Sequence, residues 1–350
     1  MKRVAFAVPG SLDTPTGGYA YDKRIIAELR VLGFQVDVID LGATFPNPDA
    51  NARAAALARL DAVAEGQPIV LDGLAFGVMA DEARALREKH PLVALVHHPL
   101  ALETGLDAAT ARALHASELA ALACTEAVIV TSPQTAEIVC RDFAVPPARV
   151  TVARPAVDRP SPSPHLRGAS GDVHLLAVGS ITPRKGYDVL MDALGSLKDL
   201  GWHLTIVGDT RSDAAFARLM ADIVRLDLRE RVALTGGADR TRLEELYASA
   251  DVFVLASLFE GYGMVFGEAI AHGLPVVATR VGAAQDIVPA DAGLLVPPGD
   301  AGAFRHALRQ VIAQADMRSA MAAAARKGAT RLPQWPDSAM QFARVLEALT

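Results

Sequence analysis

The chain has 350 residues, of which 51% are hydrophobic and 21% are charged. This length suits two domains, and the composition is that of a globular rather than a disordered protein. A net charge of -6 argues against a general attraction to nucleic acid or anionic lipid, and no apolar run is long enough to span a bilayer or to serve as a signal peptide. We therefore expect a cytoplasmic protein with no nucleic-acid partner and at most weak membrane association.

The first half of the chain alternates short apolar runs with amphipathic stretches. The predicted strands are residues 3–8, 35–41, 68–72, 92–97, 127–131 and 150–153. The predicted helices between them include residues 19–32, 75–89, 108–123 and 133–143. Alternation of this kind predicts a parallel sheet that is covered by helices on both faces.

A proline-rich segment at residues 159–171 separates this half from a second one. Its prolines alternate with Ser or Arg, so the segment cannot be helical and is predicted to be a linker. The strand pattern then restarts at residues 173–178, 203–207, 232–235, 252–255, 275–279 and 293–296. A last helix is predicted at residues 337–349. The fold class is therefore α/β, with two Rossmann-like halves of similar size.

The most informative segment covers residues 259–287. Glu260 precedes a Gly-Tyr-Gly loop, and a helical pattern that begins near Gly263 carries Glu268 on its second turn. A glycine loop that opens into a helix offers backbone N–H groups and the positive end of the helix dipole to an anion. Two carboxylates flanking such a helix start suit a ligand with hydroxyls at both ends and phosphates between them, as in a nucleotide sugar. A surface helix with two solvated glutamates is the alternative.

This segment resembles the donor-site motif of the retaining glycosyltransferases of family 4 (glycosyl transferases group 1), in which seven residues separate two glutamates. The resemblance implies the GT-B fold, with two Rossmann-like domains, a cleft between them and a C-terminal helix that crosses back to the first domain. It implies an acceptor-side domain at residues 1–163 plus 337–350, and a nucleotide-sugar-binding domain at residues 171–332. It also implies that Glu268 holds the ribose and that Glu260 makes a catalytic contact with the transferred sugar.

Two loops of the first half carry further candidates. Gly17 and Gly18 precede the first helix, and adjacent glycines let a phosphate approach bare amides. Their spacing is not that of a dinucleotide-binding motif, which removes the main support for an oxidoreductase. His97 matches the family's histidine beside the donor sugar, where it would steady the transition state, although a structural histidine in a turn is the alternative. The predicted acceptor contacts are Tyr19, His98 and Glu103.

The loops of the second half extend the predicted donor site. Cations after the strand at residues 173–178 can neutralise the phosphate charge as the nucleotide leaves. Lys185 matches the family's catalytic lysine, whereas Ser180 stands where the family has an arginine. Arg184 either turns inward or remains a solvated charge. The predicted donor-binding residues are Gly17, Gly18, Gly179, Arg184, Lys185, Gly208, Gly261, Tyr262, Gly263, Met264, Val265 and Glu268.

The sequence contains no D-x-D cluster and no spacing typical of metal ligands. We therefore expect no metal and no cofactor, with the nucleoside diphosphate sugar acting as a substrate. The predicted activity is the transfer of a hexose-type sugar to an acceptor hydroxyl, with retention by family resemblance. The alternatives are a sugar phosphorylase or nucleotide-sugar epimerase of the same fold, and a non-catalytic nucleotide-sugar-binding protein.

Overall fold

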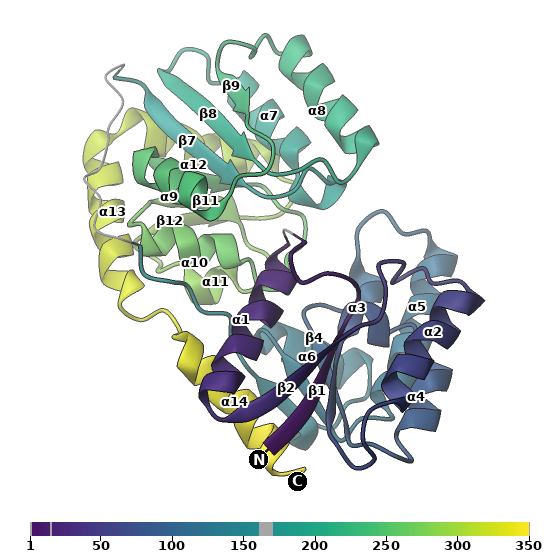
Figure 1. Cartoon of the computed structure of the whole chain (residues 1–350). Helices are drawn as coiled ribbons and strands as arrows, with labels where there is room; N and C mark the ends of the chain where they lie inside the picture. The colour runs from purple at the N-terminus through teal and green to yellow at the C-terminus, as the bar shows by residue number, and fades with distance from the viewer. Residues whose placement is uncertain (1, 15, 161–170, 350) are drawn as a thin grey trace. The chain divides into compact units, whose positions relative to one another are not determined.

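The computed structural model describes residues 2–14, 16–160 and 171–349. The chain divides into two compact units (Figure 1). The first consists of Met1–Ala156 with Pro333–Thr350, and the second of Val157–Leu332. Most of the predicted linker lies outside the described residues, as does the predicted domain boundary at residue 163. Each unit has its own parallel sheet and its own core.

The sheet of the first unit has six parallel strands in the order β2-β1-β3-β4-β5-β6. Strands β3, β4 and β5 are buried along their whole length, as expected for parallel strands covered on both faces. The strands are β1 (Lys2–Val8), β2 (Phe34–Asp40), β3 (Ile69–Asp72), β4 (Leu92–Val96), β5 (Ala127–Val130) and β6 (Val150–Val152). Every predicted strand of this half is present, with its ends within one residue of the prediction.

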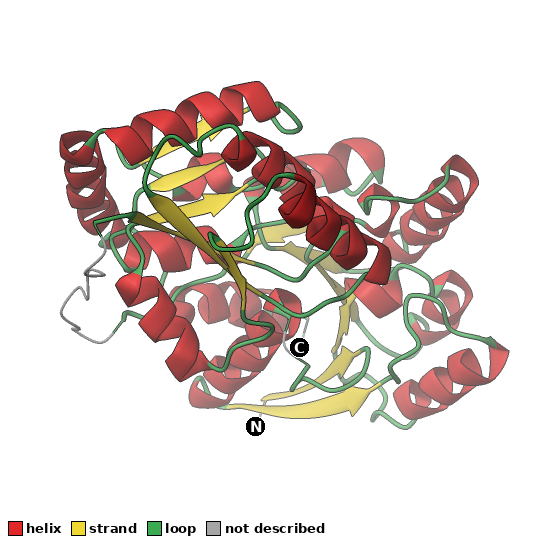
Figure 2. Ribbon diagram, turned by 90° about the horizontal axis from the view of Figure 1, so that it is seen from above, coloured by secondary structure: helices red, strands yellow, loops and turns green. Residues whose placement is uncertain are grey.

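The helices of the first unit lie on both sides of its sheet (Figure 2). Most of the longer ones begin at a Ser, Thr or Asp whose side chain accepts a backbone N–H of the first turn, which is the usual N-cap arrangement. They are α1 (Gly17–Val31), α2 (Ala50–Asp61), α3 (Gly73–Phe76), α4 (Ala80–Leu86), α5 (Ala108–Leu122), α6 (Pro133–Asp142) and α14 (Trp335–Glu347), with short 3-10 turns η1 (Leu100–Leu102) and η2 (Pro147–Arg149).

The predicted single helix at residues 75–89 is wrong, because the chain forms α3 and α4 with a turn between them. The carboxylate of Asp72 caps α3 at 2.7 Å and starts it earlier than predicted. The turn contains Gly77, where an added Cβ would lie 2.7 Å from a methyl group of Leu100. Leu100 therefore packs closely against Gly77 at this turn, which the helical periodicity did not reveal.

The C-terminal helix α14 packs against α1, so the last part of the chain completes the first unit (Figure 1). The ring of Tyr21 on α1 lies 5.9 Å from the ring of Trp335 and 6.3 Å from that of Phe342, between centroids. Ser338 Oγ donates a hydrogen bond to the carbonyl of Arg154 just after β6. The prediction of a terminal helix that returns to the first domain is confirmed.

The second unit repeats the architecture with the strand order β12-β11-β10-β7-β8-β9, again all parallel. Its strands are β7 (Val173–Val178), β8 (Trp202–Val207), β9 (Val232–Leu234), β10 (Val252–Leu255), β11 (Val276–Thr279) and β12 (Gly293–Val296). Its helices are α7 (Tyr187–Gly195), α8 (Asp213–Arg225), α9 (Arg240–Ser249), α10 (Met264–Ala271), α11 (Ala284–Ile287), α12 (Ala301–Ala313) and α13 (Ala315–Ala329), with a 3-10 turn η3 (Pro183–Lys185). The prediction of two Rossmann-like sheets is confirmed.

The two faces of this second sheet contribute to two separate cores. Leu175 and Ala177 of β7 pack into a cluster with α7, α8 and α12. Leu176 and Val178, which point to the other face, pack with α9 and α10.

None of the helices in the described ranges is long and apolar enough to cross a membrane.

The strand order predicts where each sheet binds ligands, at the carboxyl ends of its strands. The order reverses between β1 and β3 in the first sheet and between β7 and β10 in the second. Open parallel sheets bind ligands beyond the carboxyl ends of their strands at such points. The loops after β1, β3, β7 and β10 are therefore where binding groups are expected.

The packing of α14 gives a stability prediction. Phe342 is fully buried, so Phe342→Ala should cost about 3–5 kcal/mol of unfolding free energy through lost burial and a residual cavity. Urea denaturation of the whole chain measures the loss. Met340→Ala on the same helix is the control, because Met340 is 43% exposed and its truncation should change stability by at most about 0.5 kcal/mol. Equal effects of the two substitutions would contradict the packing described.

Candidate active site

The main polar cluster of the second unit surrounds Glu260, which follows β10. Its Oε1 accepts hydrogen bonds from Lys185 Nζ at 2.6 Å and from Ser257 Oγ at 2.7 Å. Its Oε2 accepts one from Arg184 Nη1 at 2.9 Å. Glu260 and Lys185 are only 6% and 8% exposed, so the charges pair largely out of solvent. Arg184 thus turns inward beside Lys185 rather than pointing into solvent.

A glycine turn holds these cations against the end of β10. The turn η3 ends at Gly186, which has a left-handed backbone with φ 62°. A Cβ at this position would overlap the carbonyl group of Ala256, so only glycine permits the close approach. The backbone carbonyl of Arg184 also accepts the N–H of Leu258 at 2.7 Å. The loop after β7 and the loop after β10 are therefore tied together at the reversal point of the sheet.

The pKa of Glu260 reflects this pairing. Burial alone would raise the pKa, but the charges of Lys185 and Arg184, with the hydrogen bonds from Lys185 and Ser257, lower it to about 2 from 4.5. The folded-state pKa lies below the unfolded one, so the stabilising contribution is complete above pH 4.5 and is lost as the pH falls towards 2. Glu260 is therefore ionised at any ordinary working pH.

The start of α10 presents backbone groups rather than a side-chain cap. Gly263 is its N-cap, with φ 86°, and has no side chain to occupy the first N–H groups. An added Cβ there would lie 2.7 Å from the ring of Phe266. The predicted donor residues around this start are Gly261, Tyr262, Met264 and Val265. The first turn of α10 therefore has no side-chain cap at Gly263, and its role in anion binding stays a prediction.

Glu268 lies in the second turn of α10. One of its carboxylate oxygens accepts a hydrogen bond from the hydroxyl of Tyr247 on α9 at 2.7 Å, which sets the orientation of the side chain. Burial raises the pKa of Glu268, and the Tyr247 hydrogen bond and the charge of Arg240 offset only part of that effect. The Tyr247 hydrogen bond therefore fixes a buried Glu268 carboxyl group at the second turn of α10.

Gly179 and Gly208 follow β7 and β8 and lie against each other. A Cβ on Gly208 would overlap the carbonyl of Gly179. A Cβ on Gly179 would lie 2.8 Å from Cε of Lys185, so glycine leaves space for the lysine. The structure therefore brings the predicted Gly179, Gly208, Arg184, Lys185 and Glu260 into one region of the second unit.

In the first unit, the predicted glycines begin α1. Gly17 is the first residue of the helix, and an added Cβ on Gly18 would lie 3.6 Å from the ring of His97. The hydroxyl of Tyr19 donates to the carbonyl of Pro9, which ties the helix start to the loop after β1. Gly18 and His97 are therefore neighbours, whereas the hydroxyl of Tyr19 already makes a contact within the protein.

His98 and Glu103, two predicted acceptor contacts, face each other. His98 Nε2 lies 3.3 Å from Glu103 Oε2, and the N–H of Thr104 donates to the other oxygen of Glu103 at 3.0 Å. Glu118 on α5 accepts the N–H of Leu100 at 3.0 Å and anchors the same loop. The two consecutive histidines thus have different partners, and the partner of His98 is Glu103.

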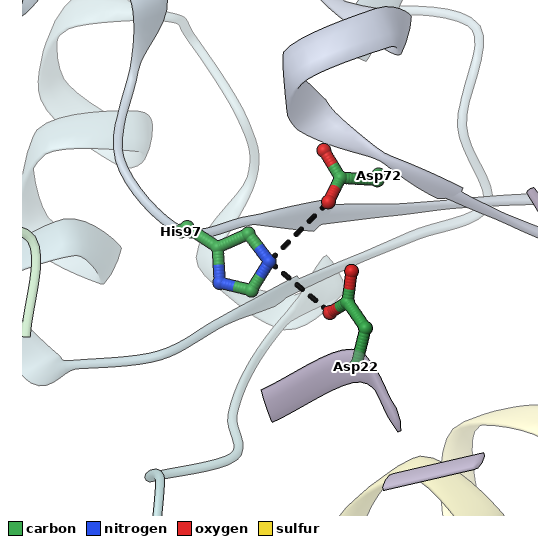
Figure 3. A group of neighbouring side chains, drawn as sticks. All are labelled: Asp22, Asp72 and His97. Atoms are coloured by element: carbon green, nitrogen blue, oxygen red, sulfur yellow. Dashed lines mark ion pairs between the residues drawn. The ribbon is translucent and has the colours of Figure 1, made fainter. Parts of the chain in front are cut away.

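Two residues that the sequence analysis did not select surround His97 (Figure 3). Its Nε2 lies 3.2 Å from Asp22 Oδ1 and 3.5 Å from Asp72 Oδ2. Asp22 comes from α1 and Asp72 from the end of β3, and both carboxylates are buried. One ring nitrogen of His97 and one oxygen of each carboxylate lie within 4.8 Å of one another, a spacing that could also hold a metal ion. The direct contacts of ion-pair length show that a protonated His97 can itself balance the carboxylates.

The sequence did contain signals for both aspartates. Asp22 lies on a helix between Tyr21 and Ile25, which are core positions, and a charged residue on an apolar helix face is unusual unless it has a partner. Asp72 ends a strand that is apolar until that point, at the carboxyl edge where ligands bind. Neither signal named His97 as the partner, because that contact is tertiary.

Two Rossmann-like units, each with its own parallel sheet, are the architecture of the GT-B fold. Residues 17–159 match the family described as Glycosyltransferase Family 4, and residues 172–314 match the family described as Glycosyl transferases group 1. The two matches together cover most of the chain. The chain belongs to glycosyltransferase family 4, group 1.

The chain is similar to several characterised proteins. It is 27% identical over 272 residues to the MMP α-(1→4)-mannosyltransferase of Mycolicibacterium hassiacum, over 73% of this chain and 65% of that protein. The fold is similar to that of sucrose-phosphate synthase from Thermosynechococcus elongatus, with a TM-score of 0.84, 22% identity and coverage of 100% and 99% of the two chains. It is also similar to Anabaena Alr3699/HepE in complex with UDP-glucose, with a TM-score of 0.80, 19% identity and coverage of 99% and 100%. The chain spans 65% and 46% of the length of the first two curated relatives it matches.

Proposed function

We propose that this protein transfers a sugar from a nucleoside diphosphate sugar to an acceptor hydroxyl, with retention of configuration and without a metal ion. The observation that carries the proposal is the second-unit cluster, in which Lys185 and Arg184 converge on Glu260 directly before the uncapped start of α10. Two cations and a helix start form a site for a diphosphate. Glu268, one turn further along the helix, suits the ribose hydroxyls.

Each group in this cluster has a task in the proposed reaction. The bond between the sugar's anomeric carbon and the phosphate oxygen breaks, and the electron pair stays on the leaving diphosphate. Lys185 and Arg184 stabilise that growing charge, because preorganised cations act where charge develops. Glu260 keeps both cations in place and contacts the transferred sugar.

The acceptor completes the reaction on the same face of the sugar. Its hydroxyl oxygen forms the new bond to the anomeric carbon, and its proton passes to the leaving phosphate oxygen. His97, beside Gly18 in the first unit, supports the sugar during this step, and His98 with Glu103 contacts the acceptor. The D-x-D motif that bridges a cation to the diphosphate is absent from the sequence, and the two side-chain cations take over that electrostatic role.

Binding of the donor tests the proposal directly. A thermal-shift panel of UDP-, GDP-, ADP- and TDP-sugars should contain one donor that raises the melting temperature, because a ligand of the folded state stabilises it. UDP-glucose is the first to try, since the structurally similar HepE binds it. Radiolabel transfer to a hydroxyl acceptor, with and without inorganic phosphate, separates a transferase from a phosphorylase. A donor that binds but is never turned over would indicate a non-catalytic binding protein.

The role of Glu268 gives a binding prediction. Glu268→Ala should weaken nucleoside diphosphate binding by about 2–4 kcal/mol, the range for charge-assisted hydrogen bonds to two hydroxyls. Isothermal titration measures the loss. Glu245→Ala is the control, because Glu245 lies on the exposed side of α9 and pairs with Arg242 at the surface. Unchanged affinity in Glu268→Ala would remove the ribose assignment.

The cations give a prediction for turnover. Lys185→Ala should lower kcat by about a hundredfold or more, the scale of losing one preorganised electrostatic contact. Arg184→Ala should cause a comparable loss, because both side chains bind the same carboxylate and face the same phosphate site. Single-turnover rates, with melting temperatures as the folding control, provide the measurement. Near-normal turnover in Arg184→Ala would leave Lys185 as the main cation, and normal turnover in Lys185→Ala would contradict the phosphate site.

Metal independence gives a further prediction. Transfer activity should survive incubation with EDTA, since Lys185 and Arg184 carry the positive charge that a divalent ion would otherwise supply. The assay compares initial rates before and after chelation and after addition of magnesium or manganese. Loss of turnover with EDTA and its recovery with either metal would contradict the proposed mechanism.

A further inference from the structure

The carboxylates of Asp22 and Asp72 have no task in the function proposed above, yet they lie against the histidine that it uses (Figure 3). Asp22 is 0% exposed, and within the described residues neither of its carboxylate oxygens has a hydrogen-bond partner. An ionised carboxylate in such a place is costly unless an opposite charge faces it. His97 Nε2 is the group that lies within ion-pair distance of both aspartates.

The surroundings of His97 supply negative charge. The titratable groups that face its ring are two carboxylates and one phenol, namely Asp22 and Tyr21 on α1 and Asp72 at the end of β3. The Tyr21 ring meets the imidazole edge-on, at 5.5 Å between centroids. Directly after β5, Thr131 Oγ1 donates to the backbone carbonyl of His97 and carries no charge. The neighbouring His98 faces Glu103 instead.

The two ring nitrogens of His97 are not equivalent. Nε2 is buried between the carboxylates. The side chain as a whole is 22% exposed, so its accessible part lies elsewhere on the ring. Nδ1 is the ring nitrogen turned away from the two carboxylates, and it is the nitrogen left for a ligand. If the imidazole ring of His97 were flipped, a carbon atom instead of Nε2 would face the buried carboxylates.

We propose that Asp22 and Asp72 are positioning residues that hold His97 doubly protonated, with Nε2–H directed between the two carboxylates and Nδ1–H directed to the ligand side. Only the catalytic consequence rests on the proposed function. A doubly protonated His97 offers the donor sugar or its phosphate an N–H donor and a positive charge, and it cannot accept a proton as a general base.

The pKa values of the three groups agree with this assignment. Burial lowers the pKa of His97, but Asp22 and Asp72 outweigh that effect and raise it to about 10. Burial raises the pKa of Asp22 to about 7, against the opposing charge of His97. Burial alone would raise the pKa of Asp72, but the hydrogen bond and the charge of His97 outweigh it and lower the pKa. Near neutral pH, His97 is therefore charged, Asp72 is ionised, and Asp22 exchanges a proton.

These shifts fix the sign of the pH dependence. The pKa of His97 is above its ordinary 6.5, so the contribution of the charged ring to stability is complete below pH 6.5 and is lost as the pH rises towards 10. The pKa of Asp22 is above its ordinary 3.8, so its contribution is complete below pH 3.8 and is lost as the pH rises through about 7. Both groups therefore favour the folded first unit at lower pH.

Nitrogen NMR of histidine-labelled protein tests the proposal without any substrate, and His97→Gln assigns the signals. Both ring nitrogens of His97 should keep the shifts of a doubly protonated imidazole from about pH 6 to about pH 8.5, whereas an unperturbed histidine changes near pH 6.5. A His97 that loses its proton with a midpoint near 6.5 would overturn the proposal. So would a change in its signals after EDTA treatment, because the carboxylates would then be holding a metal ion.

Substitution of the aspartates supplies the second arm. The double variant Asp22→Asn/Asp72→Asn should lower the His97 midpoint by about two pH units or more, because both opposing charges are lost while burial remains. Glu103→Gln, which removes the carboxylate facing His98, is the matched control and should leave the His97 midpoint in place. If circular dichroism shows that the double variant does not fold, Asp72→Asn alone should lower the midpoint by about one unit or more. An unchanged midpoint would overturn the proposal.

The kinetic consequence is tested separately in protein that shows transfer. Asp72→Asn should lower kcat more than it changes KM and should move the alkaline limb of the pH–rate profile to lower pH, a shift that a merely structural role would not cause. An unmoved limb would refute the catalytic consequence. If no transfer is detected with any donor, the proposed function fails, while the NMR midpoints still decide the charge state of His97.

Discussion

The ion cluster around Glu260 is the constraint on which the second unit depends. A carboxylate at this depth stays ionised only because Lys185 and Arg184 approach it, and two cations this close together repel each other unless a carboxylate lies between them. Glycine at residues 179 and 186 provides the space in which the three side chains meet. The cluster is thus formed before any ligand arrives, which is the condition for effective electrostatic stabilisation of a transition state. A bound phosphate would share the cations with Glu260, and this competition would limit how tightly the diphosphate product is held.

The first unit carries the opposite charge arrangement. There a single imidazole lies between two buried carboxylates, where the second unit has one carboxylate between two cations. Both clusters lie at the point where the strand order reverses, because the connections after the two neighbouring strands leave towards opposite faces of the sheet there and leave room for side chains. In each case one loop after a strand supplies part of the set, and a helix or a second loop supplies the rest.

The strands and the Glu260–Glu268 motif could be predicted because their signals are local. A fully buried parallel strand is a short apolar run, and a glycine loop before a helix is visible in the sequence. The break between α3 and α4 was not predicted, because the helical periodicity does not show that Leu100 packs against Gly77 at this turn. The inward turn of Arg184 depends on the approach of Glu260, 76 residues away along the chain. Asp22 and Asp72 stayed unassigned for the same reason, as their common partner His97 approaches them only in the folded chain.

The packing of Tyr21 against Trp335 and Phe342 has a consequence for folding during synthesis. Most of the first unit is synthesised before the second unit, whereas α14 is synthesised after it. Until it arrives, the face of α1 around Tyr21 stays exposed, and its apolar surface is available to chaperones or to other nascent chains. The second unit, encoded by one continuous segment, can fold in the interval. The contacts between α1 and α14 therefore close a loop that contains the second unit, and they can form only after α14 has been synthesised.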